Sequence, residues 1–440
     1  MHARWALSTA VLLASLAPAC GPVATPKAEW PPLAKKWFDR AQASYHAVDL
    51  EDASLAVDNA LRVDPHRDEV RVLAARIALG QLDYDRAIRS IEGIDSSEAR
   101  GLRGRAFWYS GQVERAADEL EALVTDPEVR DPWAEEVAKL ARRGAGRQPF
   151  QMTGGALAVE EMPTVGGSSF VVPLELDGEP VLGLVASGTP EVIVDSGSGR
   201  QASWVSLRFG GRVEVKDVPA LTKDLTGVSR QLNAPIKVLL GVNLLRHLHP
   251  TIDFQGSQFV VRANEPEPPP RATTLHPGYV RGGGMVVRVS LGTTESSVGS
   301  LLVDTAMQFP IALDDVGWKK AGIALGALTD VPNGGRLKQG VIPRILVGSF
   351  DIPHVPAVYG APLEEFEKGL DVDLDGIIGA GLLAAFRVTL GDDGRTLWLE
   401  DTTLPEPGAP SGTSGGEEPA QPAPPGTAPP VGAAPENQKP

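Results

Sequence analysis

One segment of the chain ends in residues that could carry out acid–base chemistry. The apolar run 301–303 ends in Asp304, which is followed by Thr305 and the small residue Ala306. A carboxylate at the end of a buried strand can activate a water molecule when a second carboxylate shares one proton with it. Whether this chain performs such chemistry therefore depends on where a partner for Asp304 is found.

An earlier segment repeats this pattern without the aspartate. The apolar run 184–185 leads into Ala186, Ser187 and Gly188. Counting from Gly178, the glycine of a hairpin turn, places Ala186 where the first copy should carry its aspartate. Alanine has no ionisable group, so the first copy lacks the acid–base residue that the second copy keeps.

Asp195 is an alternative candidate for the second carboxylate. It is followed by Ser196 and Gly197, so it keeps the order of an aspartate, a hydroxyl residue and a small residue that Asp304 begins. However, it lies nine residues after Ala186, where the second copy has Leu313 and Asp314. That position favours a glycine-rich turn, and Asp195 stays as the alternative.

The two copies share more than these loops. Short β-type runs bounded by glycine turns recur in the same order, and each copy has a later apolar run that ends in glycine, Gly241 in the first and Gly379 in the second. The matching runs are 170–176 with 285–291, 212–220 with 344–357, and 252–261 with 390–399. We therefore predict an internal duplication of an all-β unit.

These features together resemble the retropepsin-like lobe of the aspartic protease family, over lobes that we place at 150–262 and 283–402. The resemblance implies that Asp304 is catalytic and that the Thr305 hydroxyl braces it. It also implies a degenerate catalytic loop in the first lobe, formed by Ala186, Ser187 and Gly188. Gly241 and Gly379, which end the later apolar runs, are expected to be structural. Ala306 replaces the usual glycine, and its methyl group could crowd the loop.

The region 32–145 has helical periodicity, with apolar residues spaced three and four positions apart. One type of turn recurs before Ala53, Ala87 and Ala116, at spacings close to the period of about 34 residues that marks tetratricopeptide repeats. The region thus resembles degenerate tetratricopeptide repeats. The predicted fold is multidomain, with an N-terminal all-α helical repeat followed by all-β duplicated retropepsin-like lobes.

The remaining segments are the N-terminal segment, which bears on the cellular location of the protein, the linker and the C-terminal tail. Residues 1–20 have a basic start and a short apolar stretch that ends at Cys20, the only cysteine. This pattern resembles a bacterial lipobox, so we expect a signal peptide, a lipid on Cys20 and an exported, envelope-anchored protein. An ordinary signal peptide cut at 17–19 is the alternative. The proline-rich linker 263–282 joins the lobes, and the Pro/Gly-rich tail 403–440 is expected to be disordered.

Composition limits the possible partners. The net charge of −15 argues against nucleic acid. No cofactor motif or metal site is expected: His247 and His249 have strand-like spacing that favours a surface strand, and Asp371, Asp373 and Asp375 favour a solvated loop.

Two functions remain open from the sequence. In the first, the chain is a degenerate aspartic peptidase that binds a polypeptide, through its cleft or its helical-repeat groove, with weak or no cleavage. In the second, it is an active aspartic endopeptidase in which Asp304 pairs with Asp195 or with Asp304 of another chain.

Overall fold

The computed structural model describes residues 29–402 except 200, 282, 294–296, 333 and 362. Residues 1–28, which include the predicted signal segment and Cys20, and the tail 403–440 lie outside the described residues. Within the described residues, no helix has both the length and the apolar character needed to cross a membrane.

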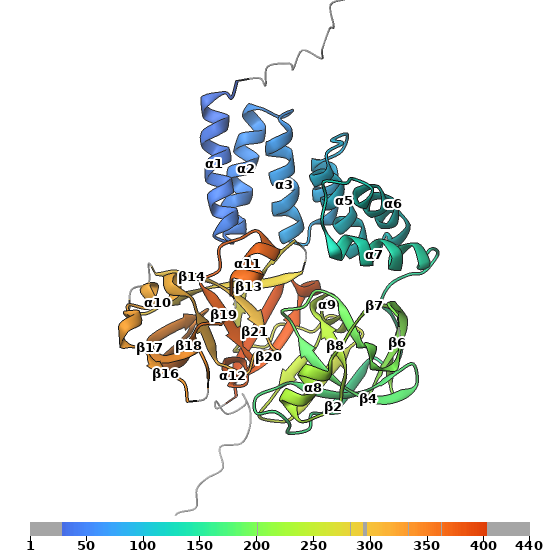
Figure 1. Ribbon diagram of the computed structural model, residues 1–440, viewed down its shortest axis with the longest axis vertical. Coiled ribbons are helices and arrows are strands. Elements are labelled where there is room, and N and C mark those ends of the chain that lie inside the picture. The colour runs from blue at the N-terminus through green and yellow to red at the C-terminus, as the bar shows by residue number, and fades with distance from the viewer. Residues whose placement is uncertain are drawn as a thin grey trace, which may run out of the picture. The chain divides into compact units, whose positions relative to one another are not determined.

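The N-terminal region is all-α, which confirms the predicted fold class. Its helices appear in blue to teal in Figure 1. They are α1 (Pro32–His46), α2 (Leu50–Val63), α3 (Asp68–Gly80), α4 (Tyr84–Ser90), α5 (Ser97–Tyr109), α6 (Val113–Val124) and α7 (Pro132–Arg143). Consecutive helices pack as antiparallel hairpins because the turns between them are short.

The predicted recurring turn has the same backbone each time. Val48 and Leu82 adopt left-handed conformations, and Gly111 does so at the matching place in the third copy. The next residue in the first two copies is an aspartate, Asp49 or Asp83, whose side chain caps the following helix by accepting a backbone N–H. The alanines Ala53, Ala87 and Ala116 are fully buried, so small side chains let the paired helices approach closely.

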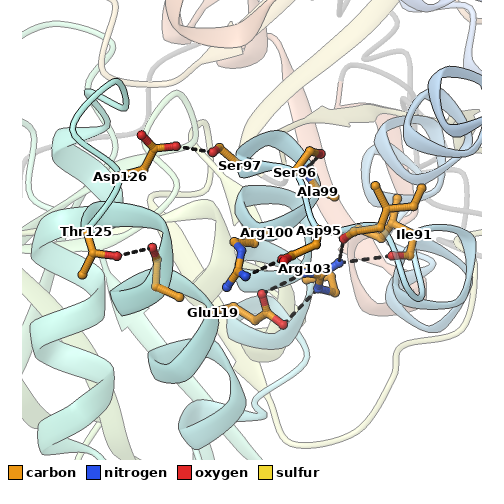
Figure 2. A network of polar contacts seen from close by, with 12 residues as sticks. Ile91, Asp95, Ser96, Ser97, Ala99, Arg100, Arg103, Glu119, Thr125 and Asp126 are labelled. Carbon is orange, nitrogen blue, oxygen red and sulfur yellow. Dashed lines mark hydrogen bonds and ion pairs between the residues drawn. The ribbon is translucent and has the colours of Figure 1, made fainter. Parts of the chain in front are cut away.

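Arg103 ties three of these helices together, as Figure 2 shows. Its guanidinium donates to the carbonyl oxygens of Ile91 and Ile94 at 3.1 and 2.7 Å, where the chain leaves α4. It also forms a two-pronged ion pair with Glu119 of α6, at 2.9 and 3.1 Å. Because Arg103 lies on α5, one side chain satisfies the exposed carbonyls of one helix end and fixes the position of the next helix.

The first lobe, green in Figure 1, folds mostly into one sheet with the strand order β1-β7-β5-β8-β4-β3-β6. Its strands are β1 (Gln151–Gly154), β2 (Leu157–Glu161), β3 (Val171–Leu176), β4 (Glu179–Ala186), β5 (Val192–Asp195), β6 (Ser203–Phe209), β7 (Val213–Lys223), β8 (Ile236–Gly241), β9 (Thr251–Asp253) and β10 (Gln258–Arg262). The helices α8 (Thr226–Leu232) and α9 (Val242–Leu248) flank β8 in the chain.

The second lobe, yellow to red, has the order β12-β13-β14-β19-β15-β18-β17-β16. Its strands are β11 (Thr273–Leu275), β12 (Gly278–Val280), β13 (Gly284–Leu291), β14 (Val298–Asp304), β15 (Ile311–Leu313), β16 (Thr329–Asp330), β17 (Lys338–Val347), β18 (Phe350–Tyr359), β19 (Gly376–Gly379), β20 (Phe386–Gly391) and β21 (Thr396–Asp401). Its α-helices are α10 (Asp315–Lys320), α11 (Leu363–Leu370) and α12 (Ala380–Leu383).

The two lobes are built alike around their central strands. In each, a strand that ends in the candidate loop runs parallel to the strand that ends in glycine, with Ala186 opposite Gly241 and Asp304 opposite Gly379. In each, a short strand pairs antiparallel with that glycine strand, β5 with β8 and β15 with β19. The predicted duplication of an all-β unit is therefore present in the backbone.

A further sheet contains strands of both lobes, in the order β11-β21-β20-β9-β10-β2. We call it the shared sheet. The lobes meet where β20 pairs antiparallel with β9, so that Thr389 lies opposite Thr251. The hydroxyls of these two threonines are 2.8 Å apart and buried. One hydrophobic core runs through both lobes, so the lobes form one packed unit.

Two sequence-based expectations about local segments were wrong, the second of them at Asp375 only, since Asp371 and Asp373 do lie in a loop and Asp373 is exposed. His247 and His249 do not form a surface strand, because α9 runs to Leu248 and His249 follows it with a left-handed backbone. His247 is stacked on Phe150, and burial lowers its pKa to about 3. Asp375 does not lie in a solvated loop: it is buried and accepts the backbone N–H of Ser300 at 2.8 Å.

Candidate functional site

The loop 186–188 of the first lobe and the loop 304–306 of the second lobe are hydrogen-bonded to each other across the lobe interface. The Ser187 hydroxyl donates to the carbonyl of Val303 at 2.8 Å, and the Thr305 hydroxyl donates to the carbonyl of Val185 at 2.7 Å. Val303 and Val185 are the residues that immediately precede Asp304 and Ala186. Each hydroxyl therefore holds the strand end that carries the opposing loop.

Each of these hydroxyls also accepts a hydrogen bond. The Ser187 backbone N–H donates to the Thr305 hydroxyl at 3.0 Å, and the Thr305 N–H donates to the Ser187 hydroxyl at 3.1 Å. We call these four bonds the reciprocal brace. The brace relates the loops by a local twofold symmetry, and all its bonds are buried, where a hydrogen bond is costly to lose.

Asp304 lies within this arrangement as a buried carboxyl group. Only 7% of its surface is exposed. The backbone N–H of Ala306 donates to Oδ1 at 3.0 Å. Burial raises the pKa of Asp304 above its ordinary value, and the backbone N–H groups of Ala306 and Gly188 oppose that shift by hydrogen bonding to the carboxylate.

Gly188 of the first loop packs directly on this carboxyl group. A Cβ atom added to Gly188 would lie only 2.5 Å from Cγ of Asp304, so no other residue fits there without moving the aspartate. The first lobe therefore covers Asp304 with backbone.

The position that matches Asp304 in the first lobe holds the buried methyl group of Ala186. Ala186 belongs to a small apolar cluster that includes Leu184, Ile193 and Leu239. Among the residues that the structure describes, neither a second carboxylate nor a basic side chain contacts Asp304. The site thus contains one carboxyl group.

Asp195 is held elsewhere. Its carboxylate pairs with Lys237 at 2.8 Å and accepts the N–H of Leu225 at 3.1 Å. The hydrogen bond from Lys237 lowers the pKa of Asp195. Because Val194 pairs with Val238, Asp195 lies near Lys237 on β8. Lys237 is four residues along β8 from Gly241, the glycine that lies opposite Ala186. At about 3.3 Å per residue this is on the order of 13 Å, too far to share a proton with Asp304.

The two glycines that end β8 and β19 are required by close backbone approach. A Cβ atom on Gly241 would collide with the carbonyl oxygen of Glu191, and one on Gly379 with that of Phe309. Ala306, in contrast, is accommodated: it is half-buried beside the apolar cluster around Ala186, and its N–H serves Asp304.

Glu191 is a buried residue near the site that the sequence did not reveal. It follows the first loop and is 4% exposed. The indole N–H groups of Trp108 and Trp133 approach its carboxylate at 3.3 and 3.1 Å. Burial raises the pKa of Glu191, while the indoles oppose the shift. Its partners lie in the helical region, so no local pattern could have identified it.

The described helices also form a cavity of about 750 Å³. It is lined by residues of both charge signs and by apolar side chains, among them Phe38, His66, Arg67, Arg76 and Ile94. A second cavity, of about 540 Å³, lies beside Asp195 and Lys237 and is lined mainly by prolines, valines and leucines. Both are concave surfaces of a size that can accept side chains of a bound polypeptide.

Comparison with known proteins gives similarity in fold. No family model matches the chain, and no curated protein matches it. A retropepsin-like aspartic protease from Rickettsia conorii is 18% identical over 29% of this chain and 89% of its own, with a TM-score of 0.21. The TPR domain of Arabidopsis OM64 is 15% identical over 25% of this chain and 95% of its own, with a TM-score of 0.24. An aspartic proteinase from Irpex lacteus is 12% identical over 56% of this chain and 98% of its own, with a TM-score of 0.38. At these identities the likeness concerns the fold alone.

Proposed function

We propose that this protein is an exported polypeptide-binding protein with an aspartic-protease-like fold, and that it cleaves weakly or not at all. The observation that carries the proposal is Ala186. It occupies the position that matches Asp304 while the reciprocal brace around both residues is complete. The scaffold that would align two carboxylates is kept, and one of the carboxylates is absent.

The chemistry of a single carboxyl group explains why cleavage would be slow. Peptide hydrolysis by paired aspartates needs one group as a base for water and one as an acid toward the carbonyl oxygen. Asp304 can take only one of these roles at a time, and the methyl group of Ala186 takes neither. Groups that act as a unit lose most of the rate when one is removed.

The active alternative would need a carboxylate from elsewhere. Asp195 is paired with Lys237 and lies on the order of 13 Å along the sheet from the required position. Asp304 of another chain would have to displace Gly188, which packs on Asp304 within the same chain. Neither source fits without rearranging the reciprocal brace.

Polypeptide binding is supported by the form of the molecule. The cavity among the helices presents arginines, acidic groups and apolar side chains side by side, which suits a peptide of mixed composition. The cavity beside Asp195 offers an apolar alternative. We further propose that a lipid on Cys20 anchors the protein in the bacterial cell envelope, where such a binder would meet other exported polypeptides.

The test uses the mature chain and a dye-labelled unfolded protein. We expect saturable binding by fluorescence anisotropy, with no cleavage fragments between pH 3 and 7 above those of Asp304→Asn. Fragments that disappear in Asp304→Asn would show that the wild type is a peptidase, and their disappearance in Asp195→Asn would identify the partner. Absence of both binding and cleavage would contradict the whole proposal.

A further inference from the structure

Three side chains that could bind a metal converge where both lobes and their linker meet. His249 follows α9 of the first lobe, Glu265 lies in the linker, and Asp393 lies in the turn between β20 and β21 of the second lobe. One nitrogen or oxygen atom from each residue lies within 4.8 Å of the others. We propose that His249, Glu265 and Asp393 form a binding site for a divalent ion of the zinc class.

The buried imidazole of His249 is the observation that points to a ligand. The residue is 9% exposed, and its Nδ1 atom is buried without a hydrogen-bond partner among the described residues. Oε2 of Glu265 lies 3.0 Å from that nitrogen, but outside the direction that a ring hydrogen bond needs. A buried nitrogen with no hydrogen bond is costly, and a shared ion would satisfy both atoms.

The spacing of the two atoms also suits a metal. Ligand atoms bound to one ion at the zinc bond length of about 2.1 Å lie about 3.0 to 3.4 Å apart, depending on the coordination geometry. The distance of 3.0 Å from Nδ1 to Oε2 matches this value. Asp393 is exposed, so its carboxylate can adjust to complete the set.

Neighbouring residues leave the proposed ligands available. Arg395 pairs with Asp392, the residue before Asp393, at 3.2 Å. Arg262 donates to the carbonyl of His249 and to the Thr251 hydroxyl. The backbone N–H groups of Asp392 and Asp393 donate to Oε1 and Oε2 of Glu265, the second at 3.5 Å. These bonds fix the carboxylate with Oε2 facing His249.

The donor set selects the class of ion. One imidazole nitrogen with two carboxylate oxygens suits zinc and similar transition metals, whereas calcium and magnesium prefer oxygen ligands alone. Three protein ligands leave at least one position for water. Because the ligands come from the first lobe, the linker and the second lobe, a bound ion would hold these three segments together at a point away from Asp304.

The test is a zinc titration of the untagged mature chain against a chromophoric chelator, with cobalt absorption as a second readout. We expect one site per chain. His249→Asn, Glu265→Gln and Asp393→Asn should each weaken binding by at least about tenfold, since even outer-shell partners of a metal contribute 10–100-fold. Asparagine tolerates the left-handed backbone at 249 and 393, so these variants should still fold.

Matched controls make the result decisive. His354→Asn changes an exposed histidine that also has a left-handed backbone, and Asp392→Asn changes the acidic neighbour of Asp393. Both controls should bind zinc like the wild type, and zinc should raise the melting temperature of the wild type and the controls only. No site in the wild type, or equal binding by all five variants, would overturn the proposal.

Discussion

Thr305→Val should weaken the contact between the lobes more than any other single isosteric change at this interface. The valine keeps the shape of the side chain but removes the hydroxyl. The buried N–H of Ser187 and the carbonyl of Val185 then lose their partner. Each buried polar group left unpaired costs about 1–3 kcal/mol, so the expected loss for these two groups is on the order of 2–6 kcal/mol.

The assay combines guanidinium denaturation with hydrogen exchange. The free energy of unfolding comes from the denaturation midpoint and slope. Exchange of the Ser187 amide reports on the brace itself, because that N–H donates to the Thr305 hydroxyl. We expect faster exchange at Ser187 in Thr305→Val and near wild-type exchange in Thr305→Ser, which keeps the hydroxyl.

Thr389→Val is the matched control, because it removes a buried threonine hydroxyl from the same lobe interface. Within the part of the chain that the structure describes, the Thr389 hydroxyl bonds only that of Thr251, which also accepts a hydrogen bond from Arg262. The control should therefore cost only about 1 kcal/mol. If Thr305→Val costs no more than Thr389→Val, or if Ser187 exchanges at the wild-type rate, the reciprocal brace does not hold the lobes as described.

Three further predictions concern the site and the anchor. Ala186→Asp, alone or with Ala306→Gly, should create a carboxylate pair with split pKa values and raise peptide cleavage above that of the wild type; equal rates would argue against a missing carboxylate as the cause of low activity. Asp304→Asn should be more stable than the wild type, by a margin that grows as the pH rises above about 4. The reason is that burial raises the pKa of Asp304, so ionising this carboxyl group lowers the stability of the wild type. A difference in melting temperature between the two proteins that stays constant from pH 3 to 8 would contradict this. Cys20→Ser should move the protein from the membrane fraction to the soluble fraction, because two or more acyl chains are needed for stable anchoring; an unchanged distribution would show that lipid does not hold it.

The features that could be predicted were those written into local patterns. The recurrence of an apolar run, a small polar loop and a later glycine was enough to align Ala186 with the position of Asp304. The alanine of each recurring helical turn and the capping aspartate of the first two likewise appear in the sequence, since helix caps and close helix packing depend on neighbouring residues. These patterns specified the fold class, and the backbone agrees with it.

The features that could not be predicted depend on residues far apart in the chain. Glu191 looks like an ordinary surface residue until Trp108 and Trp133 cover it. His249 was misjudged because α9 is only seven residues long, too short for a helical period to stand out from strand-like alternation. Pairing of β9 with β20 is likewise a choice among many possible sheet edges that no local pattern specifies.

The shared sheet has a consequence for biosynthesis. Strand β9 pairs with β10 on one side and with β20 on the other, so until β20 emerges from the ribosome one edge of β9 stays unpaired. At the usual ~5–20 residues per second, the roughly 130 residues between these strands take on the order of ten seconds to make. An exposed strand edge can pair with other chains during that time. A first half produced by itself, ending in the linker, would keep that edge permanently, and it would be expected to aggregate more readily than the whole chain.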